Sequence, residues 1–151
     1  MKNKYEINST TCAIIPLDVN TSQIIEHDDT FLVTQNSLNI IDESCKYFGS
    51  SYEGRKVGTK ALTGINYKTP IIIEETKSII FFPTSSPRLN LSTWININYV
   101  EEYKKNKEFS NILLKNGQVI ELNLSIGSLE NQILRATRLE SILRKRKNIE
   151  N

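Results

Sequence analysis

Short runs of apolar and β-branched residues, separated by polar turns, occupy most of the sequence. Residues 11–17 and 30–33 are such runs, and their composition is typical of strands. Residues 94–100 alternate apolar and polar side chains with a period of two, which predicts a strand with one face buried. The pattern therefore predicts a sheet of short strands.

Two pairs of these runs are expected to form β-hairpins. Residues 71–73 and 78–82 flank the polar segment 74–77. A proline stands on either outer side, and each is expected to mark an end of the hairpin because proline has no N–H to donate to a strand ladder. Residues 112–115 and 118–122 are joined by Asn116 and Gly117. Both of these residues tolerate a positive φ, so the dipeptide is a strong hairpin signal.

After Leu124 the pattern changes to that of a helix. Ser128 is the expected N-cap, and the helix is expected to run to around Arg146. Apolar residues recur at helical spacing and form one stripe, namely Leu129, Ile133, Ala136, Leu139 and Leu143. Arg138 and Lys145 fall opposite this stripe, and Arg135 falls on its flank. Strands followed by one long helix predict a single α+β domain over residues 1–151, with a mostly antiparallel sheet. Loops are expected at residues 45–59 and 84–93.

Length and cysteine content narrow the class of protein. The longest apolar run is residues 79–82, far short of the roughly 20 residues that a membrane-spanning helix needs. The basic start is not followed by an apolar segment of the kind found in signal peptides. Two cysteines, Cys12 and Cys45, do not suggest a disulfide framework. We therefore expect a cytosolic protein.

Charge is unevenly distributed along the chain, although the net charge is only +2. Residues 1–43 contain seven acidic and two basic side chains, whereas residues 44–60 contain one acidic and four basic ones. Residues 109–151 contain four acidic and seven basic side chains. Such asymmetry indicates a polyanionic partner, or else ordinary surface charge.

Residues 44–59 are the richest segment chemically, with three glycines and several hydroxyl, basic and aromatic side chains. Glycine allows close approach to a ligand, and hydroxyl, Arg and Lys groups contact phosphate. Gly49 and Gly54 have the spacing of a nucleotide-binding loop, but Arg55 and the two residues after it replace the Gly-Lys-Ser/Thr that this loop requires. The segment is therefore either a solvated loop or a contact loop for a phosphate backbone.

The inventory of catalytic and metal-binding residues is small. His27 is the only histidine and lies in an acidic turn, so a Cys–His nucleophile pair is not supported. One histidine and two distant cysteines do not make a zinc site. We expect no enzymatic activity, metal or cofactor. Trp94 and Tyr99 could stack on bases, but Trp94 is expected in the core.

Residues 44–59, SCKYFGSSYEGRKVGT, resemble the signature segment of the competence transcription factor family, ComK. Residues 69–73, 81–84, 94–95, 116–117 and 128–132 agree with that family in the same order. The resemblance implies a transcriptional activator of DNA-uptake genes. It also implies binding of double-stranded AT-rich boxes through the minor groove, by dimers that assemble in pairs.

The resemblance further implies contact with RNA polymerase, as for any activator, and recognition by a MecA/Clp adaptor and protease system. The sequence ends at Asn151, soon after the expected helix, whereas longer Bacillus-type members carry a C-terminal extension. An adaptor contact or activation role that belongs to this extension in those members is therefore not assigned to this chain.

The expected DNA contacts follow from the basic segment and the resemblance together. A narrow A·T-rich minor groove attracts Arg and Lys side chains. The first candidates for DNA contact are the hydroxyl and basic side chains in and next to the glycine-containing segment. The second candidates are the basic side chains on the expected C-terminal helix. The first set is Lys46, Ser50, Ser51, Arg55, Lys56 and Lys60, and the second is Arg135, Arg138 and Lys145. The alternative function is a protein-interaction module whose basic helix face meets an acidic partner, without direct DNA binding.

Overall fold

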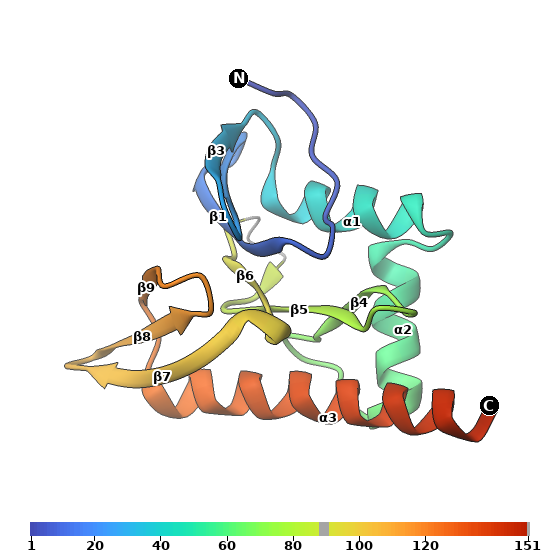
Figure 1. Ribbon diagram of the computed structural model, residues 1–151. Coiled ribbons are helices and arrows are strands. Elements are labelled where there is room, and N and C mark those ends of the chain that lie inside the picture. The colour runs from blue at the N-terminus through green and yellow to red at the C-terminus, as the bar shows by residue number, and fades with distance from the viewer. Residues whose placement is uncertain (88–90, 151) are drawn as a thin grey trace.

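The computed structural model describes residues 1–87 and 91–150. In these residues it contains two antiparallel sheets and three α-helices (Figure 1). The larger sheet has the strand order β3-β2-β1-β6-β5-β4. Its strands are β1 (Thr11–Asp18), β2 (Thr21–Glu26), β3 (Thr30–Val33), β4 (Ile71–Glu74), β5 (Ile79–Pro83) and β6 (Trp94–Asn96). The α+β class with a C-terminal helix is confirmed.

The smaller sheet contains three strands in the order β7-β8-β9. They are β7 (Val100–Asn106), β8 (Phe109–Leu114) and β9 (Val119–Leu122). The register pairs Leu113 with Val119 around the Asn-Gly turn, and Gly117 has a φ of 92°. The hairpin that the Asn-Gly dipeptide predicts is therefore confirmed.

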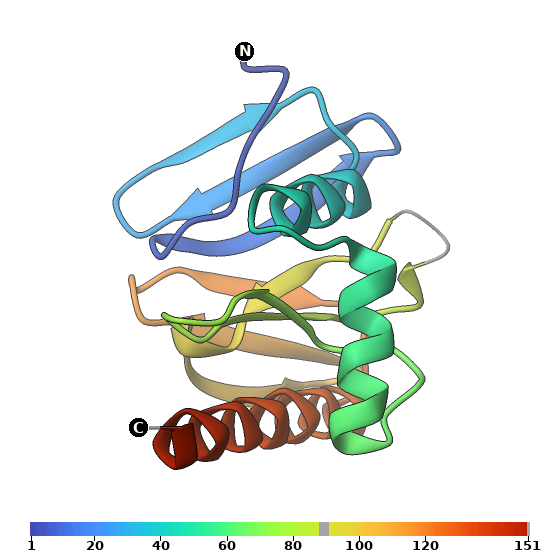
Figure 2. The same ribbon diagram turned by 90° about the vertical axis from the view of Figure 1, so that its right-hand side faces the viewer.

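Helices cover both faces of the larger sheet (Figure 2). The helices are α1 (Ser37–Tyr47), α2 (Tyr52–Thr63) and α3 (Ile126–Glu150). Alternate residues of β4 and β5 enter two different cores: Ile71 and Phe81 pack with α1, whereas Ile72 and Phe82 pack with α3 and the smaller sheet. A sheet buried on both faces explains the nearly continuous apolar runs of these strands.

The strand expected over residues 94–100 is wrong in its second half. β6 ends at Asn96, a 3₁₀ turn covers Ile97–Tyr99, and β7 follows. The Asn96 side chain causes the break, because its oxygen accepts a hydrogen bond from the Asn98 N–H while its Nδ2 donates to the Thr11 carbonyl. Strand β2 (Thr21–Glu26) was not among the expected strands.

Helix α3 confirms the expected apolar stripe, all of which is buried. The expected N-cap is wrong, because the helix begins at Ile126. The Ser125 hydroxyl accepts a hydrogen bond from the Ser128 N–H at 3.2 Å, so Ser125 has the capping role. Part of the loop expected at residues 84–93 lies outside the described residues. No helix within the described ranges is both long and apolar enough to cross a membrane.

Candidate nucleic-acid interface

The loop expected at residues 45–59 is instead the corner between two helices. α1 ends at Tyr47, a short connection with Gly49 at a φ of 86° turns the chain, and α2 begins at Tyr52. Only a residue without a side chain adopts that φ readily. The glycines of this segment thus mark one tight turn and the surface of a helix, and not an extended loop.

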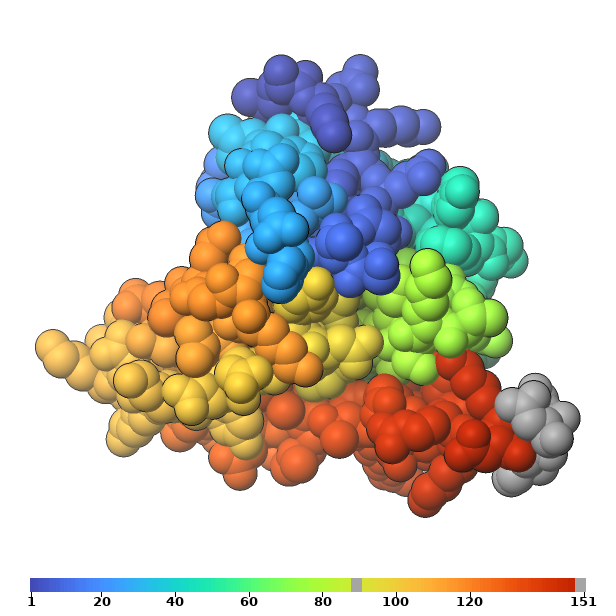
Figure 3. All heavy atoms as spheres, in the orientation of Figure 1, coloured from blue at the N-terminus to red at the C-terminus, as the bar shows by residue number. Residues whose placement is uncertain are grey.

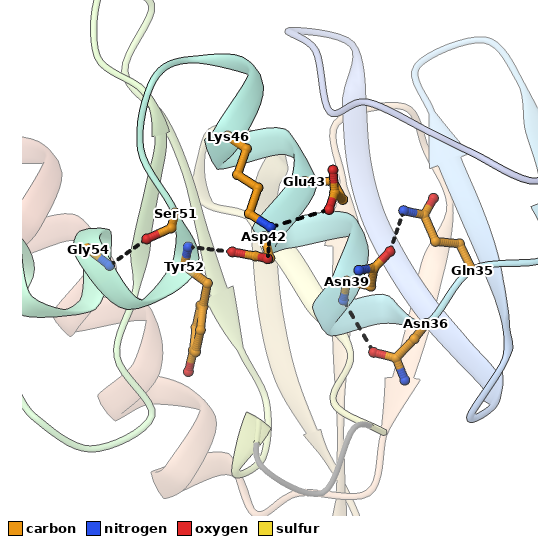
Figure 4. Close-up of polar contacts among 9 residues, drawn as sticks. All are labelled: Gln35, Asn36, Asn39, Asp42, Glu43, Lys46, Ser51, Tyr52 and Gly54. Atoms are coloured by element: carbon orange, nitrogen blue, oxygen red, sulfur yellow. Dashed lines mark hydrogen bonds and ion pairs between the residues drawn. The ribbon is translucent and has the colours of Figure 1, made fainter.

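A carboxylate of the protein itself covers the N-terminal end of α2 (Figure 4). The Tyr52 N–H donates to the Asp42 carboxylate at 2.9 Å, and the Gly54 N–H donates to the Ser51 hydroxyl at 3.0 Å. Ser51, a predicted phosphate contact, is therefore the N-cap of α2. This helix end already holds an anion, so we do not assign a phosphate to it.

Two of the predicted cations lie in ion pairs on the surface. The Lys46 Nζ atom is 3.2 Å from an Asp42 oxygen and 3.5 Å from a Glu43 oxygen (Figure 4). The hydrogen bond to Asp42 is the main cause that raises the pKa of Lys46. The Lys56 Nζ atom lies 3.7 Å from a Glu53 oxygen. Both side chains are solvent-accessible, and such pairs exchange readily for other anions.

Arg55 does not point outward, contrary to what its place in a flexible loop predicts. Its Nη1 atom donates to a Glu75 oxygen at 2.8 Å, and its side chain is only 17% exposed. Its Nε atom is buried without a hydrogen-bond partner among the described residues. The helix rotates Arg55 toward the β4–β5 turn, so this guanidinium supports the fold locally and is a poor candidate for a groove contact.

Three of the predicted contact residues are exposed cations without an ion pair in the described part of the chain, namely Lys60, Arg138 and Lys145. Lys60 lies in the last turn of α2, and the other two lie on α3. Arg135 is half-buried and anchors the loop after α2, because its Nη1 donates to the Tyr67 carbonyl at 3.2 Å. Arg55, Lys56 and Lys60 lie on α2, which packs against α3, the helix of the second set. Lys46 lies instead on α1, and Ser50 and Ser51 precede α2.

A groove of about 460 Å³ lies between α2, the β4–β5 turn and the C-terminal part of α3. Ser50 and Arg55 line it together with Arg146 and Lys147. The Lys147 Nζ atom donates to the Thr76 carbonyl at 3.1 Å and the Ser78 hydroxyl at 3.0 Å. The signature segment and the basic end of α3 therefore line the same groove, and the Glu75 carboxylate is the acidic side chain among these lining residues.

The buried cysteines are not poised for chemistry. Burial raises the pKa of Cys12 to about 11 and that of Cys45 to about 12, and both thiols are buried. Thiols with such a pKa are protonated at neutral pH and are weak nucleophiles.

The profile of the ComK protein family matches residues 2–148. The chain belongs to the ComK family. It is also 38% identical over 141 residues to the competence transcription factor of Bacillus subtilis (strain 168), covering 91% of this chain and 73% of that relative. No solved structure matches.

The lysines of the β7–β8 hairpin are absent from both sets of expected contacts of this ComK-family chain. Arg146 and Lys147 belong to a basic run whose expected roles are to complement the helix dipole or to extend the basic face of the helix, and only Lys145 of that run is among the expected contacts. A signal for the hairpin is present, because three lysines fall within four positions, 104–107. Its projection from the body depends on how the two sheets pack, which no local pattern shows.

Proposed function

We propose that this ComK-family chain is a cytoplasmic transcription activator of competence genes that binds AT-rich promoter DNA through the minor groove. The observation that carries the proposal is the family match over nearly the whole chain, together with its identity to a competence transcription factor. Dimers that assemble in pairs, RNA polymerase and a MecA/Clp adaptor stay predictions that come from the family resemblance.

The side chains that support this proposal best are the exposed cations of α2 and α3, together called the α2–α3 surface below. Lys60, Arg138 and Lys145 extend outward from rigid helices and carry no competing carboxylate at ion-pair distance in the described residues. Phosphate contacts by such side chains fix a protein on a duplex, and an A·T-rich minor groove adds a strong negative potential. Lys46 and Lys56 can add contacts only by leaving their present partners. We therefore rank them, with Ser50, Ser51, Arg55 and Arg135, below the three unpaired cations.

Replacing the three unpaired cations by alanine is expected to weaken binding to an AT-rich duplex and to reduce the salt slope by about one for each side chain lost. The matched control replaces three ion-paired cations, Lys46, Lys56 and Arg144, which changes the net charge equally. Its salt slope should change by less than one in total. Affinity is measured by fluorescence anisotropy at several salt concentrations.

Two results would contradict the proposal. Equal losses in both variants would mean that binding follows net charge and not this surface. Wild-type oligomers that form without DNA and exclude an AT-rich duplex would favour the protein-interaction module instead. Sedimentation velocity with and without the duplex distinguishes that second case.

A further inference from the structure

The β7–β8 hairpin projects from the body of the molecule. In Figure 1 its tip extends past the N-terminal end of α3, and in Figure 3 it forms the outermost point on that side. β7 is one of the two edge strands of its sheet. The turn is short, because Asn106 pairs with Phe109 across the two residues Lys107 and Glu108.

Basic side chains gather at the far end of this hairpin. Lys104, Lys105 and Lys107 are exposed and have no ion pair among the residues that the structure describes. Glu101 and Glu102 lie at the base of β7, and Glu108 is the one acidic residue in the turn. A further carboxylate, Glu121 on β9, is engaged by the Asn106 side chain at 3.0 Å. The distal end therefore presents positive charge.

Lys107 occupies a backbone position that normally suits glycine. Its φ is 57°, and two-residue hairpin turns with such a φ strongly favour Gly, Asn or Asp. A lysine there is strained relative to glycine. Lys68 and Ser78 also have a positive φ, so this conformation makes Lys107→Gly an informative substitution but is not itself evidence for a role of the side chain.

We propose that the β7–β8 hairpin is a DNA-contacting arm whose lysines bind backbone phosphates at a distance from the α2–α3 surface. This inference rests on the proposed DNA binding. Two-stranded β-ribbons fit DNA grooves. Along α3, Arg138 and Lys145 lie about 18 Å and 28 Å from Ile126, and the hairpin tip extends past that end of the helix (Figure 1). This spacing is on the order of one turn of B-form DNA, roughly 34 Å. A duplex that lies along α3 would meet Arg138 and Lys145 on one turn and the hairpin on the next.

The first test replaces Lys104 and Lys105 by serine and compares this variant with a control in which Lys4 and Lys115 are replaced by serine. All four lysines are exposed, so the two variants remove the same charge from different parts of the surface. The hairpin variant is expected to bind an AT-rich duplex about tenfold more weakly, with a salt slope lower by about two. The control should stay within about twofold of wild type at the same ionic strength.

The second test is Lys107→Gly, which separates strain from function. Because glycine accepts the positive φ, the variant is expected to melt at a higher temperature than wild type, yet to bind the duplex more weakly. Hydroxyl-radical footprinting should then show lost protection at one edge of the site only. A stabilised variant with unchanged affinity would overturn the role of Lys107.

The outcomes separate the two proposals. If wild type does not bind the duplex, the proposed function fails. If the wild-type protein binds the duplex and both hairpin variants bind it as tightly as wild type, the hairpin is not a DNA-contacting arm, but the proposed function stands. If the serine variant keeps its affinity but self-associates in sedimentation, the lysines serve to prevent edge-to-edge strand pairing, and the arm is likewise overturned.

Discussion

Raising the salt concentration from 50 to 200 mM is expected to weaken binding of this chain to an AT-rich duplex about a thousandfold, if about six phosphates are contacted. The reason is the release of condensed counterions, which becomes less favourable as bulk salt rises. The structure offers enough exposed cations for six contacts: Lys60, Arg138 and Lys145 on the helices, and Lys104, Lys105 and Lys107 on the hairpin.

The measurement is an anisotropy titration at four or more salt concentrations, plotted as the logarithm of Kd against the logarithm of salt concentration. Melting curves at each concentration provide the control, since the fold should survive this range. An affinity that hardly depends on salt would contradict phosphate contact by these side chains.

Replacing Trp94 by alanine is expected to lower the free energy of unfolding by about 3–5 kcal/mol, the usual cost of truncating a large buried aromatic residue. Trp94 is fully buried in the core between the larger sheet and α1. It pairs with Ile14 of β1 and Pro83 of β5, and the Tyr52 ring packs edge-on against it at 6.2 Å. The cavity left by alanine would therefore loosen the contact between the sheet and both N-terminal helices.

Urea unfolding followed by circular dichroism measures this effect without relying on tryptophan fluorescence. Leu134→Ala is the matched control, because that leucine is 58% exposed on α3, and its loss should change stability by less than about 0.5 kcal/mol. If Trp94→Ala leaves stability unchanged but abolishes DNA binding, the indole stacks on a base, and its assignment to the core is wrong.

Most strands, both predicted hairpins and the stripe of α3 could be predicted because each is encoded over a few neighbouring residues. Strands β2 and β7 were missed. The Asn116–Gly117 turn and the three- and four-residue spacing from Leu129 to Leu143 need no tertiary information. The same holds for the fold class, since a run of strands followed by one long helix admits few arrangements.

The α1–α2 corner could not be predicted in that way. α2 contains Gly54 and Gly58, which are poor helix formers, and it is held by contacts from distant residues. The Asp42 carboxylate of α1 accepts a hydrogen bond from the Tyr52 N–H in the first turn of α2, and the Thr59 hydroxyl donates to the Pro70 carbonyl at 3.0 Å. Glycine-rich composition therefore predicted a loop where tertiary hydrogen bonds select a helix.

The candidate site was predictable in composition but not in orientation. A basic signature segment is visible in the sequence, yet its carboxylate partners come from elsewhere in the fold. Glu75, which neutralises Arg55, lies 20 positions later in the chain. Helical rotation then decides which cations face solvent, so Lys60 is exposed while Arg55 is not.

The most direct test of minor-groove recognition compares three duplexes of equal length that carry A·T, inosine·cytosine or G·C pairs in the binding site. Inosine·cytosine lacks the guanine amino group, so it resembles A·T in the minor groove and G·C in the major groove. We expect the first two duplexes to bind with similar Kd and the G·C duplex to bind at least tenfold more weakly. Inosine·cytosine binding as weak as that of G·C would contradict minor-groove recognition by this chain.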